Sequence, residues 1–121
     1  MDIIKKINEL KELKKNFCVA TIVKTSGSTP GKVGFKYITT EDGISYGTIG
    51  GGEIEVRVFK ECKKRINDKK SDFKEYILTD KPIEQVGDSE VIPMMCSGKV
   101  WIFYEVFCSE RDDKSDYYFL N

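Results

Sequence analysis

The sequence predicts an α+β fold, a single compact domain in which a mixed, largely antiparallel sheet packs against two helices. Helix-like and strand-like patterns alternate along the 121 residues. An Asp-Gly pair at 42–43 separates two strand-like segments, which is typical of a hairpin. A chain of this length suits one hydrophobic core, and the sequence contains no internal repeat or second domain.

The first half of the chain is predicted to form one helix and three strands. Residues 3–14 carry isoleucine and leucine on one stripe, which predicts an amphipathic helix. Residues 17–25 (FCVATIVKT) are apolar and rich in β-branched side chains, as in a buried strand. A loop rich in Gly, Ser and Pro follows, and residues 35–40 and 44–49 are predicted to form the hairpin.

The second half begins with a helical period from Glu53 that is predicted to end near residues 66–70. Residues 73–78 (FKEYIL) are a candidate strand. Residues 80–95 show no period and contain two prolines and a glycine, so we expect a long loop there. Residues 99–107 (KVWIFYEVF) are apolar on both faces, which predicts a strand in the centre of the sheet.

The charge balance narrows the classes of partner. The chain has 20 basic and 20 acidic residues, so its formal net charge is zero and no broad attraction to nucleic acid or to a membrane surface is expected. The longest apolar run (FCVATIV) is too short to cross a bilayer, and the N-terminus lacks the pattern of a secretory signal. We therefore expect a cytoplasmic protein.

The absence of histidine excludes Ser-His-Asp and Cys-His catalysis within this chain, together with histidine-based metal sites. The four cysteines include no CxxC pair, so we predict free thiols and no metal site. Proton transfer would have to use carboxylate, lysine, tyrosine or cysteine side chains.

Three consecutive glycines, Gly50 to Gly52, precede the second helix, and Glu53 and Glu55 follow them. Amide N–H groups at the start of a helix favour an anion, and glycine allows the anion to approach the backbone. The pattern is neither the dinucleotide fingerprint nor the P-loop. A tight strand-to-helix turn that needs glycine for packing is the alternative.

Two further loops contain candidate site residues. In SGSTPGK, Ser28, Thr29 and Lys32 offer hydroxyl and ammonium donors for a phosphate, although many surface loops are equally polar. In PMMCSG, Cys96 and Gly98 stand at the start of a strand, where the thiol is either reactive or a small buried apolar group. The other three cysteines lie in apolar periodic runs and are predicted to be buried.

The order and spacing of these motifs resemble the N-terminal domain of the xanthine dehydrogenase accessory factor (XdhC/CoxI) family. The resemblance covers residues 17–107, nearly the whole of the single domain predicted for residues 1–121. The matching residues are Gly27 to Pro30 in the first motif, Gly47 to Gly52 with Glu55 in the second, and Cys96, Gly98 and Glu105 in the third.

The resemblance implies a maturation chaperone rather than an enzyme. It implies transient binding of the molybdenum cofactor (molybdopterin), support of cofactor sulfuration with a cysteine desulfurase, and delivery to an apo molybdenum hydroxylase of the xanthine dehydrogenase type. The glycine-lined donors would hold the anionic end, and the Cys96 thiol would face the metal or a transferred sulfur. A Cys96-dependent sulfur-transferase and a pure protein-interaction module are the alternatives, and a homo-oligomer is left open.

Three residues depart from the family pattern. Gly31 stands where the family has a basic residue, Val33 where it has proline, and Ser97 where it has the middle glycine of Cys-Gly-Gly. The C-terminal Rossmann domain of the larger members has no counterpart in this sequence. Lys32 is the nearby candidate to replace the basic residue.

Overall fold

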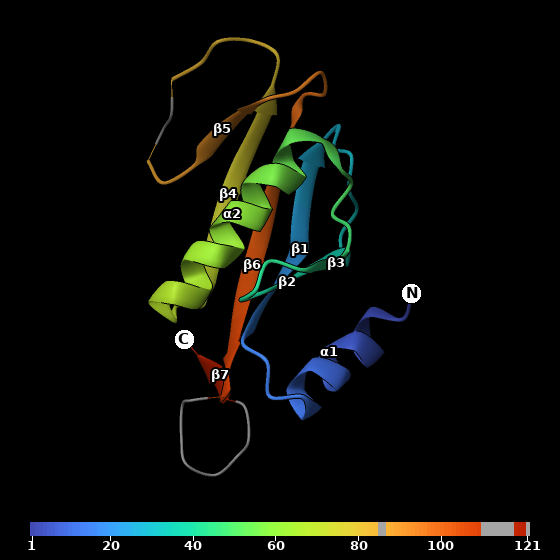
Figure 1. Cartoon of the computed structure of the whole chain (residues 1–121). Helices are drawn as coiled ribbons and strands as arrows, with labels where there is room; N and C mark the ends of the chain where they lie inside the picture. The colour runs from blue at the N-terminus through green and yellow to red at the C-terminus, as the bar shows by residue number, and fades with distance from the viewer. Residues whose placement is uncertain (85–86, 110–117, 121) are drawn as a thin grey trace.

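The computed structural model describes residues 1–84, 87–109 and 118–120 as one sheet with a helix on each face (Figure 1). The elements are α1 (Ile3–Glu12), β1 (Phe17–Gly27), β2 (Lys36–Thr40), β3 (Ser45–Gly47), α2 (Gly52–Asp68), β4 (Asp72–Thr79), β5 (Glu90–Pro93), β6 (Gly98–Cys108) and β7 (Tyr118–Leu120). The strand order is β3-β2-β1-β6-β4-β5, and β7 pairs with β6. In the described chain only the β4–β5 pair is parallel, which confirms the predicted α+β fold with a mixed, largely antiparallel sheet.

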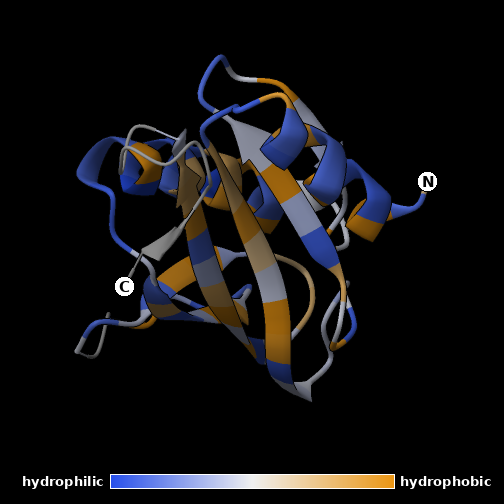
Figure 2. Ribbon diagram, turned by 90° about the horizontal axis from the view of Figure 1, so that it is seen from below, coloured by the Kyte–Doolittle hydropathy of each residue, from blue (hydrophilic) through white to orange (hydrophobic). Residues whose placement is uncertain are grey.

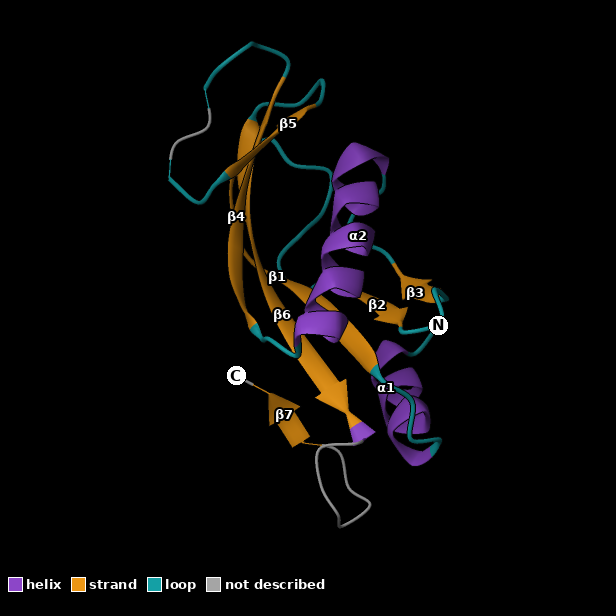
Figure 3. Cartoon of the chain, turned by 60° about the vertical axis from the view of Figure 1, so that its left-hand side comes forward, coloured by secondary structure: helices purple, strands orange, loops and turns teal. Residues whose placement is uncertain are grey.

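The two faces of the sheet carry separate apolar clusters, because successive side chains of a strand point to opposite faces. α2 lies along one face of the long strands (Figure 3) and buries its predicted stripe there. That stripe consists of Ile54, Val58, Cys62 and Ile66. α1 covers one end of the other face, where Leu10 packs with Phe17, Val19 and Ile38. The bands of hydrophobic and hydrophilic colour along the strands show the alternation (Figure 2).

Most predicted elements are confirmed. Both helices lie where the apolar period places them, although α1 ends at Glu12 rather than at residue 14. The candidate strand at 73–78 is β4, and β6 lies between β1 and β4 in the centre of the sheet. The hairpin forms at the Asp-Gly pair, with Gly43 at φ 88°. Its second strand, β3, is shorter than predicted, because the chain leaves the sheet after Gly47.

The prediction of one long loop over residues 80–95 is wrong, because β5 lies within it. β5 makes four parallel pairs with β4, from Tyr76↔Glu90 to Thr79↔Pro93. A strand this short has no detectable period, and its pairing partner lies more than ten residues away in the sequence. β7 was not predicted either, because it too is short and is defined by its pairing with another strand, β6.

A chain of ion pairs ties α2 to β4 and β5. Arg57 on α2 binds Glu53 at 2.8 Å and Glu90 on β5 at 2.6 Å. Lys74 on β4 binds Glu90 at 2.8 Å and Glu61 on α2 at 3.1 Å. Burial raises the pKa of Glu90, but the hydrogen bonds from Lys74 and Arg57 outweigh it and hold that pKa below its usual range. Glu90 therefore stabilises the fold when it is ionised.

We expect Glu90→Gln to lower the free energy of unfolding by about 1 to 3 kcal/mol at pH 7, between the values typical of exposed and buried pairs. Because the folded-state pKa is lowered, this contribution is present above the unfolded pKa of about 4.3 and is lost as the pH falls through the folded pKa. Denaturant unfolding between pH 7 and pH 3 measures the difference from the wild type. The difference should shrink on acidification, and a pH-independent difference would contradict the role of the charge. Glu12→Gln, at an exposed position of α1, is the control.

Candidate functional site

The three loops that carry the sequence motifs lie together at one end of the sheet, at the top of Figure 1. The first follows β1, the second joins β3 to α2, and the third precedes β6. The first and third meet where the β1–β6 ladder ends at the pair Gly27↔Gly98. Beyond that pair, the Ser28 N–H donates to the carbonyl of Ser97 at 3.0 Å.

Glycine is required where these loops touch, because backbone packs directly on backbone. A Cβ on Gly31 would overlap the carbonyl oxygen of Ile49, and a Cβ on Gly50 would lie 2.7 Å from the Gly31 nitrogen. A Cβ on Gly98 would overlap the carbonyl oxygen of Ser28 in the first loop. No other residue allows such approach. The first loop is thus pressed against both the second and the third.

The triple glycine also has a conformational cause. Gly50, Gly51 and Gly52 have φ values of 113°, 76° and 74°, in the region that other residues rarely adopt. Gly51 caps α2 without any side-chain hydrogen bond, and a Cβ on it would meet nothing within 4 Å. Close packing therefore requires glycine at position 50, whereas at position 51 the requirement for glycine comes from the backbone conformation alone.

The carboxylate of Glu55 occupies part of the place that the sequence analysis assigned to an external anion. Its Oε1 accepts from the Thr48 hydroxyl at 2.7 Å and from the N–H groups of Ile49 and Gly51, each at 3.0 Å. The Gly50 N–H donates to the Thr48 hydroxyl at 3.0 Å. An anion from solution is thus left with the first-turn N–H groups of α2, which have no carbonyl partner within the helix.

The residues of the first loop divide between structure and surface. The Thr29 hydroxyl donates to the carbonyl of Gly31 at 2.8 Å, so it shapes the loop. Ser28 and Lys32 are exposed, and the Lys32 side chain makes no ion pair within the described ranges. Gly31 is buried against Ile49, so no basic side chain fits at that position, and Lys32 beside it provides the positive charge of this loop.

Cys96 differs from the other cysteines. It is partly exposed and packs against the margin of the α2-side core, as Met94 also does. Cys18, Cys62 and Cys108 are at most 2 % exposed. The prediction that the other three cysteines are buried is confirmed, and Cys96 is the most accessible thiol of the four. The Met94 methyl lies 3.0 Å from where a Cβ on Gly52 would stand, which links the third loop to the start of α2.

Two residues of the predicted motifs do not point into this site. Glu53 is bound by Arg57. Glu105 stands seven positions beyond Gly98 on β6, opposite Val19, or about 23 Å away at 3.3 Å per residue. Burial raises the pKa of Glu105, and Lys36 opposes that rise only in part.

A cavity of about 370 Å³ adjoins the glycine turn and was missed from the sequence. It is lined by Tyr37, Gly52, Glu55, Val56 and Phe59. The sequence gives only a weak indication of this cavity, because Phe59 lies beside the apolar stripe of α2 and is predicted to be a core residue.

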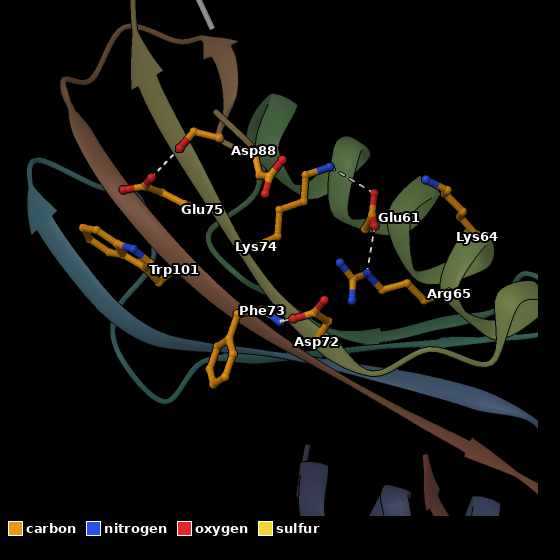
Figure 4. A pocket seen from close by; sticks show the side chains of 10 residues that line it. Glu61, Lys64, Arg65, Asp72, Phe73, Lys74, Glu75, Asp88 and Trp101 are labelled. Atoms are coloured by element: carbon orange, nitrogen blue, oxygen red, sulfur yellow. Dashed lines mark hydrogen bonds and ion pairs between the residues drawn. The ribbon is translucent and has the colours of Figure 1, made fainter. Parts of the chain in front are cut away.

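A larger cavity, about 560 Å³, lies beside the outer edge of β4 (Figure 4) and contains none of the predicted site residues. Several of its charged groups are already paired with neighbouring side chains. Glu61 binds Arg65 and Lys74, and Glu75 accepts from the Ser89 hydroxyl. We interpret it as a polar surface groove. Within the described ranges there is no cluster of metal-ligating side chains and no helix long and apolar enough to cross a membrane.

The geometry defines an α+β domain whose three glycine-containing loops lie together at one end of the sheet, with an accessible thiol on the third loop. Comparison with known proteins gives the family. Residues 10–77 match the model of the XdhC and CoxI family, so the chain belongs to that family. No curated protein matches the chain. Among solved structures, a crystal structure of a xanthine dehydrogenase from Bacillus halodurans has a TM-score of 0.69 at 23% sequence identity. The match covers 88% of this chain and 30% of that one, and at this identity it shows the fold alone.

We expect Gly31→Ala to lower the free energy of unfolding by about 1 to 3 kcal/mol, because the new methyl group must displace the Ile49 carbonyl. Val33→Ala, at an exposed position of the same loop, is the control and should change stability by less than about 0.5 kcal/mol. Denaturant unfolding measures both. Equal stabilities of the two variants would show that the loops are not held in this contact.

Alkylation near neutral pH should modify Cys96 first, because the other three thiols are buried. Peptide mass spectrometry after short exposure to iodoacetamide measures the order. The Cys96→Ser variant should remain unlabelled until it is unfolded. Labelling of Cys108 or Cys62 at a comparable rate in the folded protein would contradict this assignment.

Proposed function

We propose that this chain is an accessory protein that binds the molybdenum cofactor transiently and supports its sulfuration and insertion into a molybdenum hydroxylase of the xanthine dehydrogenase type. The observation that carries the proposal is that the glycine-containing loops of all three family motifs lie together at one end of the sheet. Membership of the XdhC and CoxI family supports it.

The donor set of the site fits such a ligand. The first-turn N–H groups of α2, the Ser28 hydroxyl and the Lys32 ammonium are available to an anionic phosphate. The Cys96 thiol is a soft ligand suited to a sulfur-bound metal. The bound cofactor would supply the molybdenum centre, while the residues of this chain hold it and limit access of water. Thr29 and Gly98 serve indirectly, by fixing the loops.

The proposed partners are a cysteine desulfurase and the apo-hydroxylase that receives the cofactor. A sulfur-transferase is the second candidate function, because Cys96 is the accessible thiol of the four. In that reaction the desulfurase persulfide would pass its outer sulfur to Cys96, which becomes a persulfide, and the desulfurase thiol would be restored. A persulfide trapped on Cys96 would support this candidate.

Cofactor released from a molybdenum hydroxylase should comigrate with the purified protein in gel filtration, as measured by the fluorescence of its oxidised pterin. Gly51→Val should abolish most of this retention, because the branched side chain distorts the start of α2. Gly43→Val is a matched control: Gly43 has φ 88° and likewise has nothing within 4 Å of its Cβ position, but it lies in the β2–β3 hairpin. Both variants should lose similar stability, and only the first should lose the cofactor.

The wild type retaining no cofactor would overturn the proposal. Equal retention by the two glycine variants would remove the glycine turn from the site. Binding of the desulfurase or hydroxylase without cofactor retention would instead support a pure interaction module.

A further inference from the structure

The cavity beside the glycine turn shares two residues, Gly52 and Glu55, with the motif that the family match includes. It lies between the first two turns of α2 and β2, and its volume is about 370 Å³. It therefore adjoins the proposed cofactor site at the first turn of α2, and the function proposed above gives no role to its side chains.

The walls of this cavity are largely apolar and include two aromatic rings. Tyr37 is 8% exposed and belongs to the α2-side core, and Phe59 packs against the same core, so both are held in place. Val56 is 46% exposed and forms an apolar rim. Flat rings bury apolar area efficiently against aromatic faces, and such walls favour a planar ligand.

The charged group among the residues that line the cavity is the carboxylate of Glu55, which has a fixed orientation. Three donors hold Oε1 of Glu55, namely the Thr48 hydroxyl and the N–H groups of Ile49 and Gly51. Within the described ranges, Oε2 accepts no hydrogen bond and no basic side chain pairs with Glu55. An ionised carboxylate only accepts, so a ligand must present N–H or O–H groups to Oε2.

These features select one class of ligand. A phosphate or carboxylate would be repelled by Glu55, and an aliphatic chain would leave Oε2 without a donor. A planar nitrogen heterocycle with an amino group beside a ring N–H meets both demands, since its face covers the aromatic walls and its edge donates to the carboxylate.

We propose that this cavity binds the pterin ring of the cofactor, with Glu55 accepting from the N–H edge of the ring and Tyr37 and Phe59 packing against its face. The choice of a pterin among planar heterocycles rests on the proposed function. The anionic end of the same ligand then lies away from Glu55, on the side of the first loop.

The test uses pterin itself, 2-amino-4-oxopteridine, with the full chain, and follows quenching of pterin fluorescence. Glu55→Gln is the informative variant. Its amide oxygen can still accept the three donors of the glycine turn, while its NH₂ replaces Oε2 and faces the ligand donors. We expect saturable binding to the wild type and a loss of about tenfold or more in affinity for the variant.

Glu53→Gln is the control, because Glu53 is the neighbouring first-turn carboxylate, pairs with Arg57 and does not line the cavity. It should bind pterin like the wild type. Val56→Lys is a second test variant for the case that Glu55→Gln is unstable. Because Val56 is an exposed helix position, the substitution should leave the fold intact. It should weaken binding by removing the apolar rim.

The outcomes separate this inference from the proposed function. Absence of saturable pterin binding, or equal binding by the wild type, Glu55→Gln and Val56→Lys, overturns the inference even if the intact cofactor is retained. Pterin binding that depends on Glu55, in a protein that retains no intact cofactor, supports the pocket and overturns the proposed function.

Discussion

The structure of the site depends on direct contact between backbone segments at one end of the sheet. Gly31 lies against the Ile49 carbonyl, and Gly98 lies against the Ser28 carbonyl of the first loop. These contacts leave no room for side chains, so the three loops are held at a fixed separation by the glycines themselves. The start of α2 is fixed by the same contacts, because Gly50 packs on the first loop immediately before the helix begins.

Two carboxylates at opposite sides of α2 show how the surrounding donors decide what an acidic residue does. Glu90 is surrounded by Arg57 and Lys74, so its charge joins α2 to the outer strands. Among the described residues, Glu55 has only neutral donors, and they hold a single oxygen. The other oxygen stays open to a ligand. One carboxylate therefore stabilises the fold, whereas the other stabilises the glycine turn and faces a cavity.

Local patterns were enough to predict much of the fold. The apolar period of α2 and the two apolar faces of β6 are properties of contiguous residues, and both elements lie where they were predicted. The burial of Cys18, Cys62 and Cys108 followed from the same patterns. β5 and β7 could not be predicted in this way, because such short strands exist only through pairing with β4 and β6.

The sequence by itself determined the fold class, the buried stripe of α2 and the three loops that needed glycine. The tertiary structure alone decided which groups meet. It placed the Ile49 carbonyl against Gly31, directed the Glu55 carboxylate back to the glycine turn and brought Tyr37 and Phe59 to the wall of one cavity. The physical reason is that burial is encoded by the period of neighbouring residues, whereas a hydrogen bond or a cavity wall depends on atoms that approach only after distant segments have packed.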